Sequence, residues 1–79
     1  MTLADTRMRR DIQKELVKRE IESNLINVSV VNAVVYLDGE LRAIRGATMD
    51  CRREREIIQE VITRMKGVRD VVNNLKVPL

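Results

Sequence analysis

The longest run rich in β-branched residues lies between positions 28 and 41. Such residues fit a pleated, half-buried surface, so this run predicts strands. Asn32-Ala33 interrupts the run near its middle, and Asn tolerates the left-handed backbone angles of a tight turn. We therefore expect one strand over Ile26–Val31 and an antiparallel partner over Val34–Leu41, with side chains alternating between the two faces.

A competing turn signal lies at Asp38-Gly39. An Asp-Gly pair fits a two-residue hairpin turn better than Asn-Ala does. A turn at this point would give one long strand up to Leu37 and a second strand over Glu40–Arg45. The first register is our prediction, and the second is its alternative.

Two other segments have the apolar periodicity of helices that pack on a sheet. The first helix is expected over about Thr6–Asn24, and the second over Cys51–Lys66. Thr48 and Asp50 are candidate caps for the second helix, and Gly67 is its stop signal. The apolar positions are Met8, Ile12, Leu16, Ile21 and Leu25 in the first helix, and Ile57, Ile58, Val61, Ile62 and Met65 in the second.

A third strand is expected over about Val71–Val77, where Pro78 ends it. A hairpin followed by a helical crossover makes one antiparallel and one parallel strand pair. The pattern therefore predicts an α+β fold, αββαβ, with two helices packed on one face of a small three-stranded mixed sheet. Its expected core is Ile12, Leu16, Ile21, Val28, Val30, Val35, Leu37, Ile58, Val61, Ile62, Leu75 and Val77.

The composition argues against catalysis and against nucleic-acid binding. The 79 residues include no His, Phe or Trp and a single Tyr, so there is no imidazole base and no aromatic platform for single-stranded nucleic acid. The single cysteine, Cys51, has no His partner and is read as a small residue at a helix start. A KH-type nucleic-acid fold would need a Gly-x-x-Gly loop, which the chain lacks. We expect no enzyme activity, no cofactor and no metal site.

The positive charge is concentrated in one segment. The chain has a formal net charge of +3, and residues 42–55 carry five Arg against Asp50 and Glu54. The simpler interpretation of this arginine cluster is a solvated surface without a ligand, as is usual for surface charge. The functional interpretation is a patch that binds an anionic surface, with lipid headgroups as the first candidate and RNA as the second. Its candidate residues are Arg42, Arg45, Arg52 and Arg53.

Two segments together resemble one family. Val28–Gly39 reads Val-x-Val-x-Asn-Ala-Val-Val-x-Leu-x-Gly, and Gly67–Val77 reads Gly-Val-x-x-Val-x-Asn-x-Leu-x-Val. Both are similar to signatures of the BON domain, named from bacterial osmotic-shock and nodulation proteins, and the helix from about Arg9 also fits. The chain departs from the family at Ala33, where Gly is usual, and in a longer segment after Leu41.

The resemblance implies an αββαβ fold without catalytic residues. It covers residues 9–77 as one domain and leaves residues 1–8 as a flexible N-terminus. The role that the resemblance implies is attachment to membranes through phospholipid, usually in the bacterial envelope. The motif residues with an expected structural role are Asn32, Gly39, Gly67, Val68 and Asn73.

Two functions follow as hypotheses. The first is a non-catalytic binding module that associates with anionic phospholipid membranes or with an envelope protein partner. The second is a structural assembly module of a bacterial envelope complex, which could form homo-oligomers through an open sheet face or edge strand. The chain shows neither a transmembrane stretch of ~20 apolar residues nor a secretory signal, so it is expected to be cytoplasmic as it stands, although the family is usually periplasmic.

Overall fold

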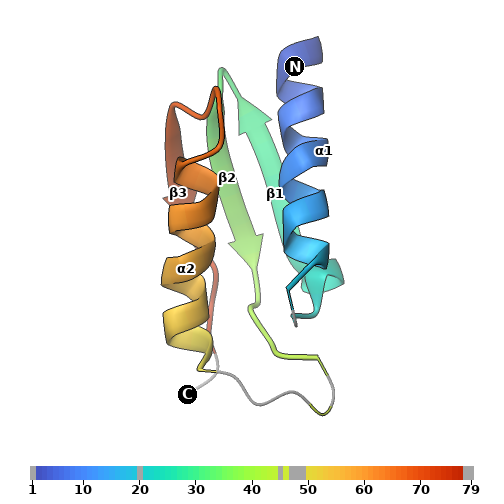
Figure 1. The fold of residues 1–79 in the computed structure, drawn as a ribbon, viewed down its shortest axis with the longest axis vertical. Helices are drawn as coiled ribbons and strands as arrows, with labels where there is room; N and C mark the ends of the chain where they lie inside the picture. Colours follow the sequence, from blue (N-terminus) through green and yellow to red (C-terminus); the bar gives the residue numbers. More distant parts are fainter. Residues whose placement is uncertain (1, 20, 45, 47–49, 78–79) are drawn as a thin grey trace.

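A computed structural model describes residues 2–19, 21–44, 46 and 50–77 of the chain. In this part of the chain, two α-helices lie on one face of a three-stranded sheet (Figure 1). The predicted α+β fold, αββαβ, is therefore confirmed. The elements are α1 (Leu3–Val17), a 3₁₀ turn η1 (Ser23–Leu25), β1 (Ile26–Val31), β2 (Val34–Gly39), α2 (Cys51–Thr63) and β3 (Asp70–Asn73).

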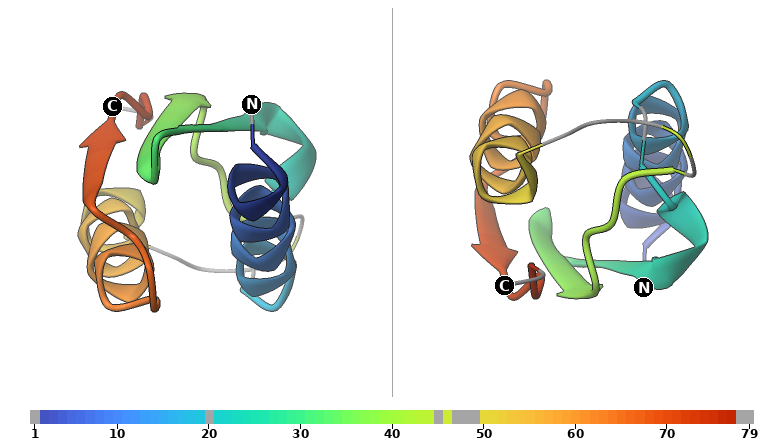
Figure 2. Two further views of the ribbon diagram at one scale, coloured as in Figure 1. Left: turned by 90° about the horizontal axis from the view of Figure 1, so that it is seen from above. Right: turned by 90° about the horizontal axis from the view of Figure 1, so that it is seen from below.

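The strand order in the sheet is β1-β2-β3, with β2 antiparallel to β1 and parallel to β3. Val31 pairs with Val34, so the two-residue turn is Asn32-Ala33 and the predicted register is confirmed. The alternative turn at Asp38-Gly39 is wrong, because Asp38 is paired with Asn27 inside the hairpin. Figure 2 shows that α1 lies over β1 and α2 beside β3, both on the same side of the curved sheet.

The hairpin turn depends on a buried carboxylate from the first helix. Asn32 and Ala33 both have positive φ, 51° and 64°, which is the backbone of a type I′ turn. Their N–H groups donate to Oδ2 and Oδ1 of Asp5, each at 3.1 Å. Asp5 is only 5 % exposed, and its own N–H donates to the Thr2 hydroxyl at 3.0 Å, which caps α1.

These hydrogen bonds control the ionisation of Asp5. Burial raises the pKa of the Asp5 carboxyl, but the N–H groups of Ala33 and Asn32, together with Thr2, outweigh this effect. The pKa of Asp5 consequently lies below its usual value. The ionised carboxylate therefore stabilises the positive-φ backbone of the turn at Asn32 and Ala33.

The first helix was expected over Thr6–Asn24, and both of these bounds are wrong. It begins at Leu3 and ends at Val17, and Lys18 is its C-cap. The apolar periodicity continues beyond the helix because Ile21 is also a buried core residue; it lies after the helix end and forms an isolated antiparallel bridge to Ala43. The assignment of residues 1–8 to a flexible segment and 9–77 to the domain remains a prediction.

The second helix begins at Cys51 as predicted. Asp50 is the N-cap, since its Oδ1 accepts from the N–H groups of Arg52 and Arg53, whereas Thr48 lies outside the described residues. The helix ends at Thr63 rather than at Lys66. Shorter strands are also observed: β2 ends at Gly39 and β3 at Asn73, and beyond them only an isolated bridge continues the pairing, from Glu40 to Lys76.

The core lies between the helices and the sheet and is aliphatic. Of the predicted core residues, all are buried except Val61 and Val77, which are half-buried. Sequence pattern missed Ile26, Leu41 and Val71, which are also buried. The core cluster is Ile12, Leu16, Ile21, Ile26, Val28, Val30, Val35, Leu37, Leu41, Ile58, Ile62, Val71 and Leu75.

Replacement of Gly39 by Ala tests a close approach between two backbone segments. Gly39 has φ +107°, and an added Cβ would overlap the carbonyl oxygen of Leu25. We expect a loss of about 3 kcal/mol in unfolding free energy, since neither backbone segment can move aside. Gly46→Ala is the matched control, because Gly46 also has positive φ (+88°) but nothing within 4 Å, and should cost about 1 kcal/mol. Urea denaturation checks both values, and equal losses would contradict the overlap.

Replacement of Asp5 by Asn tests the carboxylate that holds the turn. At neutral pH we expect a thermal midpoint roughly 5–10 °C below the parent's, because charged acceptors are lost from two hydrogen bonds. A depressed pKa makes the Asp5 contribution fully present above about pH 4 and lost as the pH falls below that value. The gap between parent and variant should therefore stay constant above about pH 4 and narrow as the pH falls below that value in circular-dichroism melts.

The exposed Asp11 on the same helix provides the control, since Asp11→Asn should leave the midpoint nearly unchanged at every pH. A gap between parent and Asp5→Asn that stays constant with pH would show that the Asp5 charge does not stabilise the turn.

Candidate functional site

Three residues of the predicted anionic-surface patch, Arg42, Arg52 and Arg53, are among those that the structure describes. Arg42 is exposed, and its Nε lies 2.9 Å from Oε2 of Glu40, so its charge is locally balanced. Arg52 and Arg53 are exposed in the first turn of α2. Arg45 lies outside the described residues. Binding by these four arginines therefore remains a prediction.

The fifth arginine of this segment has a structural role. Arg55 donates from Nη2 to the Asn73 carbonyl at 2.8 Å and from Nε to the Leu75 carbonyl at 3.1 Å. The Asn73 side chain also bonds to α2, because its Nδ2 donates to the Arg55 carbonyl and to Oε1 of Gln59, both at 3.3 Å. Its Oδ1 accepts from the Leu75 N–H at 3.2 Å. Arg55 and Asn73 together fasten the end of β3 to α2.

The remaining motif residues lie at turns and at the core boundary. Asn32 is the first of the two turn residues before β2, and Gly39 is the last residue of β2; both have positive φ. Gly67 has φ +90°, and an added Cβ would lie 3.3 Å from the terminal methyl of Met8. Val68 is half-buried and packs against the core. None of these residues presents a reactive side chain at the surface.

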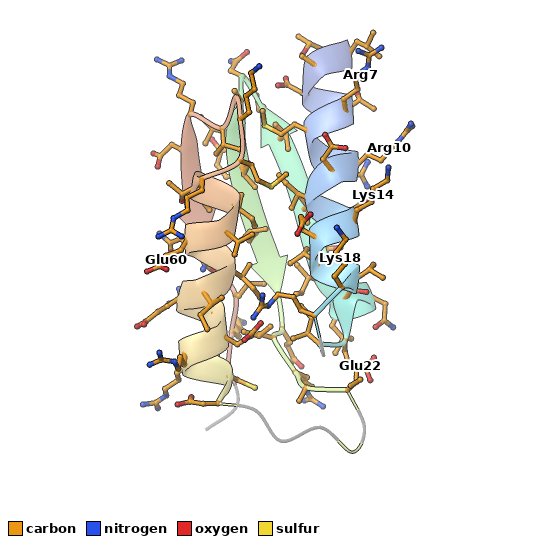
Figure 3. All side chains as sticks on the ribbon, viewed as in Figure 1. Arg7, Arg10, Lys14, Lys18, Glu22 and Glu60 are labelled. Atoms are coloured by element: carbon orange, nitrogen blue, oxygen red, sulfur yellow. The ribbon has the colours of Figure 1, made fainter. Side chains whose placement is uncertain are left out.

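An exposed row of cations on α1 was missed by the sequence analysis. Arg7, Arg10, Lys14 and Lys18 follow spacings of three, four and four residues, so they share one side of the helix. Figure 3 shows Arg7, Arg10 and Lys14 projecting from the side of α1 that faces away from α2. We refer to these four residues as the basic face of α1.

The cations of the basic face are largely free of partners. Lys18 pairs with Glu15 at 3.2 Å, a solvent-exposed contact of small energetic weight. Within the described ranges, Arg7, Arg10 and Lys14 have no carboxylate within ion-pair distance. Exposed Asp11 and half-buried Glu15 are the nearby acidic residues of the same helix. The basic face is therefore available to an external anion.

The basic face could have been found from helical spacing, but a charge tally hides it. Residues 1–24 carry six basic and five acidic side chains, which nearly cancel. In the fold, Asp5 is buried at the turn, and Arg19 is removed from the surface row by an ion pair with Glu54 on α2. The hydrogen bond to Glu54 raises the pKa of the Arg19 guanidinium, which favours its charged form in this ion pair.

The outer face of α2 has a different character. A shallow hollow of about 370 Å³ is lined there by Glu56, Gln59, Glu60, Thr63 and Arg64. Glu60, labelled in Figure 3, projects from this helix on the side of the molecule opposite the α1 row. The carboxylates of Glu56 and Glu60 make this face unsuited to an anionic ligand.

Other chemistries find no site in the described residues. No group of three His, Cys, Asp or Glu side chains comes together there as a metal site. Among the same residues, no helix has the length and apolarity needed to cross a bilayer. Cys51 is half-buried and packs against the core, as a small structural residue does.

A family model described as the BON domain matches residues 4–45 and 48–78, nearly the whole chain. No curated protein matches the chain.

Replacement of Arg55 tests the fastening of β3. Arg55→Gln should lower the unfolding free energy by about 1–3 kcal/mol, because two strand carbonyls lose a charged donor. Arg55→Lys should recover only part of this loss, since an ammonium cannot reproduce the planar fork. Arg52→Gln, exposed on the same helix, is the control and should change stability by about 0.5 kcal/mol or less. Urea denaturation checks the ranking, and equal effects at positions 52 and 55 would contradict it.

Proposed function

The chain belongs to the BON domain family, a family of non-enzymatic binding modules, and from this premise we propose that it associates with anionic phospholipid membranes. The observation that carries the proposal is the basic face of α1. From Arg7 to Lys18 the row spans about 16 Å at 1.5 Å per residue, so all four cations can reach a flat surface together. Leu3, 67 % exposed at the start of the same helix, offers an apolar contact with the headgroup boundary.

The expected binding is weak and electrostatic. Each Lys or Arg near an anionic leaflet contributes about 1 kcal/mol, and the attraction falls off within about 8 Å at physiological salt. Asp11 and Glu15 offset part of this attraction. A single module therefore binds reversibly, and affinity falls steeply as salt rises.

A second location for the same function is the patch predicted from sequence. Arg42, Arg45, Arg52 and Arg53 remain candidates, with Arg42 weakened by its pairing to Glu40. We rank the basic face of α1 first, because its four cations form one row along a single helix, whereas Arg42 is paired with Glu40. An envelope protein is the other class of partner, and a homo-oligomeric assembly module is the alternative function.

Paired charge-neutralising variants separate the two locations. Arg10→Gln/Lys14→Gln and Arg52→Gln/Arg53→Gln each remove two positive charges from exposed helix positions, so they are matched in net charge. Sedimentation with vesicles of phosphatidylglycerol and phosphatidylcholine, against phosphatidylcholine alone, measures binding. We expect the first double variant to lose about tenfold or more in affinity at low salt and the second to lose much less.

The opposite ranking would move the site to the predicted patch at α2. If neither variant differs from the parent, lipid binding is not electrostatic and a protein partner becomes the better proposal. Sedimentation equilibrium of the free protein tests the assembly alternative, which requires defined oligomers.

A further inference from the structure

The face of the sheet opposite the helices is not covered by any helix or strand of the described residues. Figure 2 shows α1 and α2 on the same side of the sheet. The inward side chains of β1 and β2 are buried against these helices, so the alternate side chains point to the other side. We refer to that side of the sheet as the open face.

Four apolar side chains gather on the open face. Val31 pairs with Val34, and Tyr36 pairs with Val72, so the four occupy two adjacent rows across the three strands. Val31 is 52 % exposed and Tyr36 36 %, whereas Val34 and Val72 are half-buried. Two such rows lie about 7 Å apart and three strands are about 10 Å wide, which matches the contact stripe of one helix. We call these four residues the tyrosine patch.

The charged residues that adjoin the tyrosine patch are acidic. Asp70 pairs with Val34, and Asp38 follows Tyr36 by two residues on β2, so one acid lies at each end of the patch. Both are exposed, and within the described ranges neither has an ion-pair partner. Oδ1 of Asp70 accepts from the N–H of Val71, a neutral group, so the negative charge is not cancelled.

The nearest cations do not compensate these two acids. Arg42 is paired with Glu40 at 2.9 Å. Lys76 follows Val72 by four residues along the strand, about 13 Å, which is more than the screening length of about 8 Å in physiological salt. Arg69 alternates with the acid at position 70 and is therefore directed to the helix side of the sheet. The tyrosine patch is consequently bordered by negative charge, although the chain has a net charge of +3.

This combination selects the occupant of the open face. An anionic bilayer is repelled by Asp38 and Asp70. A second copy stacked about a two-fold axis through Tyr36 would place Asp38 against an aliphatic side chain or against its own equivalent, and either contact desolvates a carboxylate without a partner. A segment with cations beside an aliphatic stripe matches both the apolar and the charged part of the surface.

We propose that the open face binds a basic amphipathic helix of a partner protein, with its aliphatic stripe on the tyrosine patch and its cations beside Asp38 and Asp70. The helix adds the second covering layer that an apolar sheet face requires. Tyr36 is the expected anchor of the contact, since tyrosine is enriched among the residues that dominate interface energies. Membrane association uses the cations of α1 instead, and the test contains no lipid, so either proposal can fail alone.

The probe is a blocked peptide of about 14 residues with leucine at the i, i+3, i+4 and i+7 positions of a helix and lysine elsewhere. The matched peptide has glutamate in place of lysine. Tyr36 is the single aromatic residue of the chain, so its fluorescence reports on the tyrosine patch alone. We expect the lysine peptide to protect Tyr36 from acrylamide quenching, and the glutamate peptide to need at least a tenfold higher concentration.

A pair of double variants tests the charge. Asp38→Asn/Asp70→Asn removes the two acids of the open face and should weaken the lysine peptide about tenfold at low salt. Asp11→Asn/Glu60→Gln is the control, because it removes the same charge from exposed positions on the two helices. It should change the affinity less than about twofold.

A pair of valine substitutions tests the apolar contact. Val31→Ser removes a methyl-bearing side chain from the tyrosine patch and should weaken the lysine peptide about fivefold. Val17→Ser makes the same change at a valine of α1 that is 69 % exposed, and should leave the affinity unchanged.

No binding of the lysine peptide, binding without protection of Tyr36, or equal effects within either pair of variants would overturn the proposal. Protection of Tyr36 that rises with protein concentration in the absence of peptide would identify a second copy as the occupant and overturn it as well.

Discussion

The carboxylate of Asp5 holds the first helix and the hairpin in one arrangement. It accepts from two consecutive N–H groups of a turn whose backbone has positive φ at both residues. Without an acceptor, those N–H groups would face the buried end of α1 unpaired, at a cost comparable to a lost hydrogen bond. The position of α1 over β1, and with it the layer of aliphatic side chains between them, follows from this contact.

Local chemistry made the hairpin and the second helix predictable from sequence. The β-branched runs on either side of Asn32-Ala33 define the strands, and Asp50 at the start of α2 has its cap partners two and three residues away. The end of α1 was not predictable in the same way. Ile21 continues the helical spacing, but in the fold its backbone pairs with Ala43, a residue far along the chain.

The candidate binding surfaces show the same limit. A local count of arginines placed Arg55 in an anion-binding segment, whereas its partners are carbonyls of β3 that only the folded chain brings near. Conversely, the row from Arg7 to Lys18 is visible in helical spacing, but balanced charge in the first 24 residues conceals it. Charge is therefore better compared between the exposed faces of the fold. Buried acids such as Asp5 and Glu54 do not count toward these faces.

The Arg55 guanidinium at the edge of β3 affects how many copies of the domain can join through their sheets. A sheet with two open edges can join its neighbours head to tail without limit, because an unclosed heterologous contact repeats into a filament. Here Arg55 occupies the carbonyls that a neighbour's strand would need on one side. Edge-to-edge growth through β3 is thereby opposed.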